Sequence, residues 1–170
     1  MTQAPAHKFK VTYSTLASPD PLLHQMYDQA VADFRANAGQ TYPMYINGEE
    51  RFAEQTFAKI SPTDTDLVMG YFQKGTEQDA NDALAAAKAA YPIWRDTPWQ
   101  ERITLLRRAA DLLSERLFKM GAVMSLEVGK NRLEALGDVE ETADLIRYNC
   151  DAMEQNNGFA KPLKNESEKH

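Results

Sequence analysis

The second half of the chain, residues 76–156, consists of helix-forming segments, and this limits the fold more than any other feature. Thr76 begins a capping-box pattern, and the Ala-rich run after it has high helix propensity. Pro92 predicts a kink or an end for this helix. Thr97 then stands as an N-cap with Pro98 in the first helical turn, so a second helix is expected to begin there.

Two further helical segments carry apolar residues at helical spacing. The helix after Thr97 is expected to break near residues 119–121 and to resume as far as Val128, with Gly129 as its C-cap. A last long helix is expected over about residues 131–156. The first stripe contains Ile103, Leu106, Ala110, Leu113 and Leu117, and the second contains Leu136, Val139, Ala143, Ile146, Cys150 and Met153. The second stripe predicts the buried face of the last helix.

The first half predicts one helix and a small β structure. Asp20 is a good N-cap for a helix that Gly39 can end, whereas residues 1–19 are expected to be irregular. Asn47-Gly48 is a strong signal for a two-residue hairpin turn. Strands are expected at residues 42–46, 57–60 and 67–72. The expected class is α+β, mostly helical with a small antiparallel β-hairpin or meander.

Composition excludes several classes of partner. A net charge of −6 argues against nucleic acid, because phosphate binding needs clustered Lys and Arg. No apolar run approaches the roughly 20 residues of a membrane helix, and the N-terminus lacks the apolar core of a secretory signal. The single cysteine allows no intrachain disulfide, which favours a reducing compartment. We therefore expect a cytoplasmic protein with no membrane or nucleic-acid partner.

The residues offer no catalytic group, cofactor site or metal site. Cys150 lies on the apolar stripe of the last helix, where a cysteine is a buried small hydrophobe rather than a nucleophile. The histidines, at positions 7, 24 and 170, show no metal-ligand spacing. Lys130 follows Gly129 without the glycines of a phosphate-binding loop, and this pair is interpreted as a helix end followed by a basic residue.

One cluster has functional potential. Glu134, Asp138 and Glu141 are spaced i, i+4 and i+7, so they share one face of the last helix. Three such carboxylates repel one another unless they are solvated or face a cation. Either this is a solvated acidic face, or one carboxylate holds a ligand ammonium group through a charge-assisted hydrogen bond. The spacing alone does not distinguish these alternatives.

The order of several short motifs resembles the N-terminal part of the NAD(P)-dependent aldehyde dehydrogenases, over about residues 40–160. The motifs are residues 45–48, residues 61–62, the Ala-rich helix ending in Trp94, residues 102–113 and residues 127–130. Residues 127–131 and 138–141 resemble most the branch that comprises the 1-pyrroline-5-carboxylate (L-glutamate γ-semialdehyde) dehydrogenases.

This resemblance implies a reaction and one site residue. The branch oxidises L-glutamate γ-semialdehyde to L-glutamate with NAD, in the second step of proline breakdown. The position of Glu141 matches a glutamate that helps to anchor the substrate's α-amino group, whereas Glu134 and Asp138 keep the solvated interpretation. The implied partners are a small amino-acid aldehyde and, for the complete enzyme, further copies of itself in a homo-oligomer.

The resemblance also implies that the catalytic machinery lies elsewhere. The family's catalytic cysteine, general-base glutamate and NAD site all match positions C-terminal to His170. We therefore expect the N-terminal segment of a longer enzyme, or a truncated gene product, which is inactive alone. Residues 1–157 would form the helical and β-hairpin part of an NAD-binding domain in an α/β, Rossmann-like fold. Residues 158–170 would begin an oligomerisation hairpin, with a strand starting near Phe159. The alternative is an inactive stand-alone helical binding or scaffolding module derived from this family.

Overall fold

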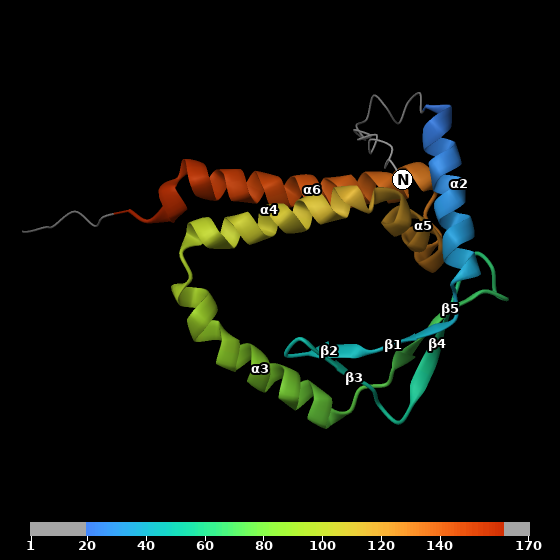
Figure 1. Cartoon of the computed structure of the whole chain (residues 1–170), viewed down its shortest axis with the longest axis horizontal. Coiled ribbons are helices and arrows are strands. Elements are labelled where there is room, and N and C mark those ends of the chain that lie inside the picture. The colour runs from blue at the N-terminus through green and yellow to red at the C-terminus, as the bar shows by residue number, and fades with distance from the viewer. Residues whose placement is uncertain (1–19, 162–170) are drawn as a thin grey trace, which may run out of the picture.

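A computed structural model describes residues 20–161 of the 170-residue chain (Figure 1). The expectation for residues 1–19 lies outside this range. The elements are α2 (Pro21–Ala36), β1 (Gln40–Tyr42), β2 (Met44–Ile46), β3 (Glu49–Arg51), β4 (Thr56–Ile60), β5 (Val68–Gln73), α3 (Glu77–Asp96), α4 (Trp99–Glu115), α5 (Leu117–Val128), α6 (Arg132–Gln155) and the short 3₁₀ helix η1 (Asn157–Phe159). The expected α+β class with mostly helical content is confirmed.

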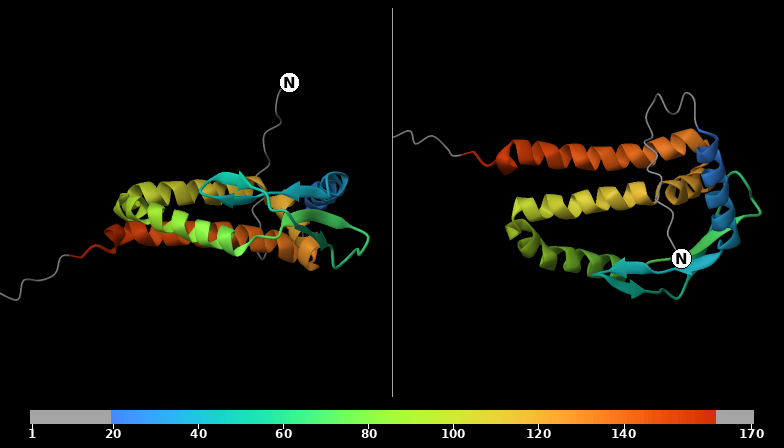
Figure 2. Two further views of the ribbon diagram at one scale, coloured as in Figure 1. Left: turned by 90° about the horizontal axis from the view of Figure 1, so that it is seen from below. Right: turned by 45° about the horizontal axis from the view of Figure 1, so that its top comes forward.

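The helices α4, α5 and α6 form the packed part of the molecule together with α2. Figures 1 and 2 show α4 and α6 side by side, running in opposite directions, with α5 and α2 packed near the start of α6. The core cluster at this end consists of Leu23, Tyr27, Leu117, Leu136 and Val139. Burial of such apolar side chains is the main source of stability for helices of this length.

The predicted stripe of α6 is largely confirmed. Its buried residues are Ala135, Leu136, Val139, Ala143 and Cys150, whereas Ile146 and Met153 are half-buried. On α4 and the start of α5, Ile103, Ala110 and Leu117 are buried, but Leu106 is exposed. The face of α6 opposite the buried stripe is therefore directed away from the core.

The β structure is divided into two small sheets. The three-stranded sheet has the order β1-β5-β4, with β1 parallel and β4 antiparallel to β5, so the expectation of purely antiparallel pairing is wrong for β1. The predicted strand 42–46 is also split, because Pro43 separates β1 from β2, which pairs with β3 instead. The turn between β2 and β3 is confirmed: Asn47 and Gly48 have φ of 55° and 79°.

One predicted helix boundary is wrong, and one of two alternatives for another is excluded. Helix α3 continues through Pro92 to Asp96, so Pro92 does not end it, and the alternative of a kink at Pro92 stays a prediction. Thr97 is the C-cap of α3 rather than the N-cap of α4. The Thr97 N–H and hydroxyl both donate to the carbonyl of Ile93, at 3.0 and 2.8 Å. A threonine that bonds back to the preceding turn no longer satisfies the N–H groups ahead of it, and Pro98 takes the N-cap position of α4.

Other boundaries agree with expectation or shift slightly. The capping box at Thr76 and Asp79 is confirmed, as is Gly129 as the left-handed C-cap of α5. The break between α4 and α5 falls at Arg116 rather than near residues 119–121. The strand expected from Phe159 is wrong at its start, because Phe159 ends η1, and residues 162–170 lie outside the described range.

Helix α3 is set apart from the other helices. None of its twenty residues is buried, and Figure 1 shows it connected to α4 at one end and to β5 at the other. Arg51 of β3 bonds Asp79 at 3.2 Å and Asp82 at 2.6 Å, which ties the start of α3 to the hairpin. No helix in residues 20–161 is long and apolar enough to cross a membrane.

Candidate functional site

The acidic face of α6 is positioned by the turn that begins the helix. Gly129 ends α5 with a φ of 78°, a left-handed conformation that reverses the chain direction at little steric cost. The Asn131 side chain then accepts hydrogen bonds from the N–H groups of Leu133 and Glu134, at 3.1 and 3.0 Å. These two devices fix the first turn of α6 and with it the direction of its acidic side chains.

Packing of α6 decides which of its carboxylates are accessible. Glu140, on the side towards α4, accepts a hydrogen bond from the Ser114 hydroxyl at 3.0 Å. Glu134 and Glu141 are exposed, and Asp138 between them is half-buried. The three predicted carboxylates therefore share one outward face, as their spacing requires.

The ammonium group of Lys130 is the cation that lies against this acidic face. Its ammonium group contacts a carboxylate oxygen of Asp138 from the turn that precedes α6. The hydrogen bond to Asp138 raises the pKa of Lys130, and the charges of Asp138, Glu134 and Glu141 raise that pKa further. Both paired side chains are more than a third exposed, 39% and 36%, so the pair itself adds little stability.

The side chain of Glu141 makes no hydrogen bond or ion pair with any other residue in the described range. Its carboxylate is exposed to solvent, one turn away from the Lys130–Asp138 pair. An unpaired, solvated carboxylate on a rigid helix can accept hydrogen bonds from a ligand ammonium group without first breaking an internal contact. The geometry permits the predicted role of Glu141, which stays a prediction.

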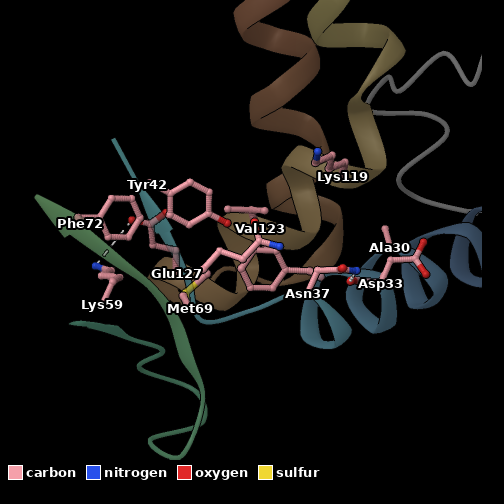
Figure 3. Close-up of a pocket in the computed structure, with 12 residues that line it drawn as sticks. Ala30, Asp33, Asn37, Tyr42, Lys59, Met69, Phe72, Lys119, Val123 and Glu127 are labelled. Carbon is pink, nitrogen blue, oxygen red and sulfur yellow. Dashed lines mark hydrogen bonds and ion pairs between the residues drawn. The ribbon is translucent and has the colours of Figure 1, made fainter. Parts of the chain in front are cut away.

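A separate groove of about 780 Å³ lies between α2, α5 and the three-stranded sheet (Figure 3). Its lining combines the stacked rings of Tyr42 and Phe72, 5.2 Å apart, with an ion pair of 3.8 Å between Lys59 and Glu127. The full lining is Ala30, Asp33, Phe34, Asn37, Gln40, Tyr42, Lys59, Met69, Phe72, Lys119, Val123 and Glu127. Sequence reasoning missed this groove, because its residues come from five elements with no common spacing.

Cys150 and His24 both have structural roles. Cys150 is 1% exposed and its thiol lies 3.8 Å from the carbonyl of Ile103, which confirms it as a buried small hydrophobe. His24 of α2 lies 2.9 Å from the guanidinium of Arg132, which also bonds Asp28 at 2.8 Å, so these residues join α2 to α6. Within residues 20–161, no group of three or more His, Cys, Asp or Glu side chains is placed to hold a metal ion.

Comparison with known proteins identifies the family. The model of the aldehyde dehydrogenase family matches residues 49–170, which is more than half of the chain. The chain belongs to the aldehyde dehydrogenase family. The resemblance carried by the order of its motifs is thereby confirmed.

Curated relatives similar in sequence are named 1-pyrroline-5-carboxylate dehydrogenase. The enzyme of that name from Staphylococcus aureus strain MW2 is 35% identical over 128 residues, which are 75% of this chain and 25% of the relative. The chain thus spans about a quarter of the length of the curated relatives it matches.

Solved structures of the same enzyme have the same fold. 1-Pyrroline-5-carboxylate dehydrogenase from Thermus with bound NAD matches 98% of this chain, with a TM-score of 0.82 and 28% identity, over 32% of its own chain. The Mycobacterium tuberculosis enzyme bound with NAD and cobalamin matches 98% of this chain and 30% of its own, with a TM-score of 0.77 and 25% identity. The arrangement of α2 to α6 and the two small sheets is therefore part of an aldehyde dehydrogenase fold.

Proposed function

We propose that this chain is the N-terminal segment of an NAD-dependent aldehyde dehydrogenase that oxidises L-glutamate γ-semialdehyde to L-glutamate in proline degradation. The observation that carries the proposal is the similarity to 1-pyrroline-5-carboxylate dehydrogenases, over 75% of the chain in sequence and over 98% of it in fold. In this proposal residues 1–157 belong to the NAD-binding domain and residues 158–170 begin an oligomerisation hairpin of a homo-oligomeric enzyme.

Within residues 20–161, the first turn of α3 does not fit an NAD site. Strand β5 leads through Gly75 into α3, which is the order of elements in a dinucleotide-binding unit. However, Thr76 and Asp79 already cap the first turn of α3, and Glu77 and Asp79 make it acidic. Negative charge at a helix N-terminus disfavours a bound pyrophosphate. NAD, which accepts the hydride, is therefore assigned to residues outside this segment.

The segment also holds no suitable nucleophile in its described part. Cys150 is buried against the α4 backbone, away from solvent and from any base that forms a hydrogen bond with it. The catalytic thiol and general base of the proposed reaction are accordingly assigned to the remainder of the enzyme. The role left for this segment is to shape the substrate site and to support the cofactor domain.

Glu141 is the proposed contact with substrate. Its exposed, unpaired carboxylate would accept charge-assisted hydrogen bonds from the α-ammonium group of the amino-acid aldehyde. This interaction distinguishes an amino-acid aldehyde from a simple aliphatic aldehyde, which has no ammonium group.

The test is substrate selectivity in the complete enzyme. Glu141→Ala is expected to raise KM for L-glutamate γ-semialdehyde about tenfold or more, because a hydrogen bond to a charged group contributes about 1.5–3 kcal/mol. KM for propionaldehyde should stay unchanged. Glu134→Ala is the matched control, since Glu134 is an exposed carboxylate of the same face and should affect neither substrate. Equal effects of Glu141→Ala on both aldehydes would contradict the anchor.

A second candidate function is an inactive binding or scaffolding module. The observation that favours it is the apolar surface of α3, where Leu84, Tyr91, Ile93 and Trp94 are all exposed. Size-exclusion chromatography and an NADH-formation assay on the 170-residue chain separate the two candidates. A monodisperse, inactive chain favours the module, and an aggregating chain favours a segment that needs the rest of its enzyme. Turnover by this chain alone would contradict both.

A further inference from the structure

Lys130 is the one residue of the α5–α6 turn whose side chain is directed onto the acidic face. Gly129 before it adopts the left-handed conformation, and Asn131 after it caps α6. Its backbone is therefore held between two fixed points. From this position its ammonium group contacts Asp138, two turns along the helix.

The contact changes how many carboxylates are free for a ligand. Asp138 lies one turn from Glu134 on one side and one turn from Glu141 on the other, which places neighbouring carboxylates about 5–6 Å apart at their Cβ atoms. With Asp138 occupied by Lys130, the remaining two are seven residues apart, or about 10 Å along the axis. A single ammonium group cannot bridge that distance, so it binds at one carboxylate only.

We infer that Lys130 is a positioning residue for the proposed substrate anchor: by occupying Asp138 it keeps Glu134 and Glu141 apart as separate carboxylates, so that the substrate's α-ammonium group binds the proposed anchor Glu141 alone. The inference rests on the proposed function. Without Lys130, the Asp138 and Glu141 carboxylates would form an adjacent pair, and the ammonium group would settle between them. The aldehyde would then be displaced from the reacting groups, and a shift of about 1 Å can lower turnover about a hundredfold.

The electrostatics of the turn support this role. The pKa of Lys130 is raised, first by its hydrogen bond to Asp138 and then by the charges of Asp138, Glu134 and Glu141. The lysine therefore stays protonated at neutral pH and interacts electrostatically with all three carboxylates.

The test is a split between KM and kcat in the complete enzyme. Lys130→Met is expected to lower kcat for L-glutamate γ-semialdehyde about tenfold or more without raising KM, because the acidic face still attracts the ammonium group. The kcat for propionaldehyde should not change. Lys130→Arg, which keeps the cation, should retain most of the activity.

The decisive measurement is whether a second substitution, at Asp138, restores the kcat lost in Lys130→Met. Lys130→Met combined with Asp138→Asn removes the competing carboxylate, so kcat for the semialdehyde should return towards that of the unmodified enzyme. A purely structural role for Lys130 predicts no such recovery, because the double variant still lacks the contact. Failure of the rescue, or an equal loss with both aldehydes, would overturn the inference.

The inference and the proposed function fail in different ways. If Glu141→Ala has no selective effect on the amino-acid aldehyde, the anchor itself is wrong. If Glu141→Ala is selective but Lys130→Met leaves kcat for both aldehydes unchanged, the anchor stands and the role of Lys130 is refuted.

Discussion

Helices α6 and α3 have similar local sequence signals but opposite environments. Both are long, with 24 and 20 residues, and both begin with a side-chain cap, at Asn131 and Thr76 respectively. Yet α6 has five buried residues and packs on α4 and α5, whereas α3 has none. The comparison shows that caps and helix propensity suffice to place a helix along the chain. Neighbouring elements decide whether its apolar side chains are buried.

The largest expected effect contrasts one leucine in each helix. Leu136→Ala in α6 should lower the free energy of unfolding by about 2–5 kcal/mol, because Leu136 is 0% exposed and its removal leaves a cavity. Leu84→Ala in α3 is the matched control and should change stability by less than about 0.5 kcal/mol, since Leu84 is exposed. Urea unfolding of the 170-residue chain measures both. Similar losses would mean that α3 is packed in solution.

A smaller effect is expected where the sheet region meets α5. The Ser61 hydroxyl, 1% exposed, donates to the Leu126 carbonyl at 2.5 Å and accepts from the Thr63 N–H at 3.3 Å. Ser61→Ala leaves that carbonyl unpaired and should destabilise the chain by about 1–3 kcal/mol. Thr65→Ala, at an exposed position of the same loop, should be nearly neutral. If thermal unfolding shows no difference between these variants, the buried bond does not hold the two regions together.

The smallest effect concerns α3 alone. Thr76→Ala removes the cap that bonds the Asp79 N–H at 3.2 Å and should weaken the start of α3 by about 1 kcal/mol. Because α3 contributes nothing to the buried core, its amide hydrogens should exchange about fivefold faster while those of α6 stay unchanged. Faster exchange in both helices would show that α3 and α6 unfold as one unit.

Local chemistry accounts for the parts of the fold that the sequence predicted correctly. The cap at Thr76, the Asn47-Gly48 turn and the left-handed Gly129 each depend on residues only a few positions apart. The errors arose where a distant or competing partner intervened. Thr97 bonded back to Ile93 instead of capping α4, and β1 paired in parallel with β5, whose residues lie thirty positions further along the chain.

The acidic face shows the same division between what the sequence predicted and what only the folded chain decided. The spacing of Glu134, Asp138 and Glu141 placed them on one face of a helix, and the resemblance to aldehyde dehydrogenases singled out Glu141. From the sequence alone, Lys130 was interpreted only as a basic residue that follows the end of a helix. Its contact with Asp138 depends on how the α5–α6 turn folds back onto α6, and neither the motif nor the spacing contains that information.

The sequence by itself determined the helices, the hairpin turn, the buried stripe of α6 and the family, because these depend on local caps, on periodicity and on short motifs in a recognisable order. The tertiary structure alone decided that α3 has no buried residue, that β1 joins β5, and that Lys130 lies against the acidic face. The physical reason is that burial and strand pairing depend on residues far apart in the chain, which meet only once the elements have packed. The Lys130–Asp138 contact joins residues only eight positions apart, but it depends on the direction in which the α5–α6 turn presents Lys130.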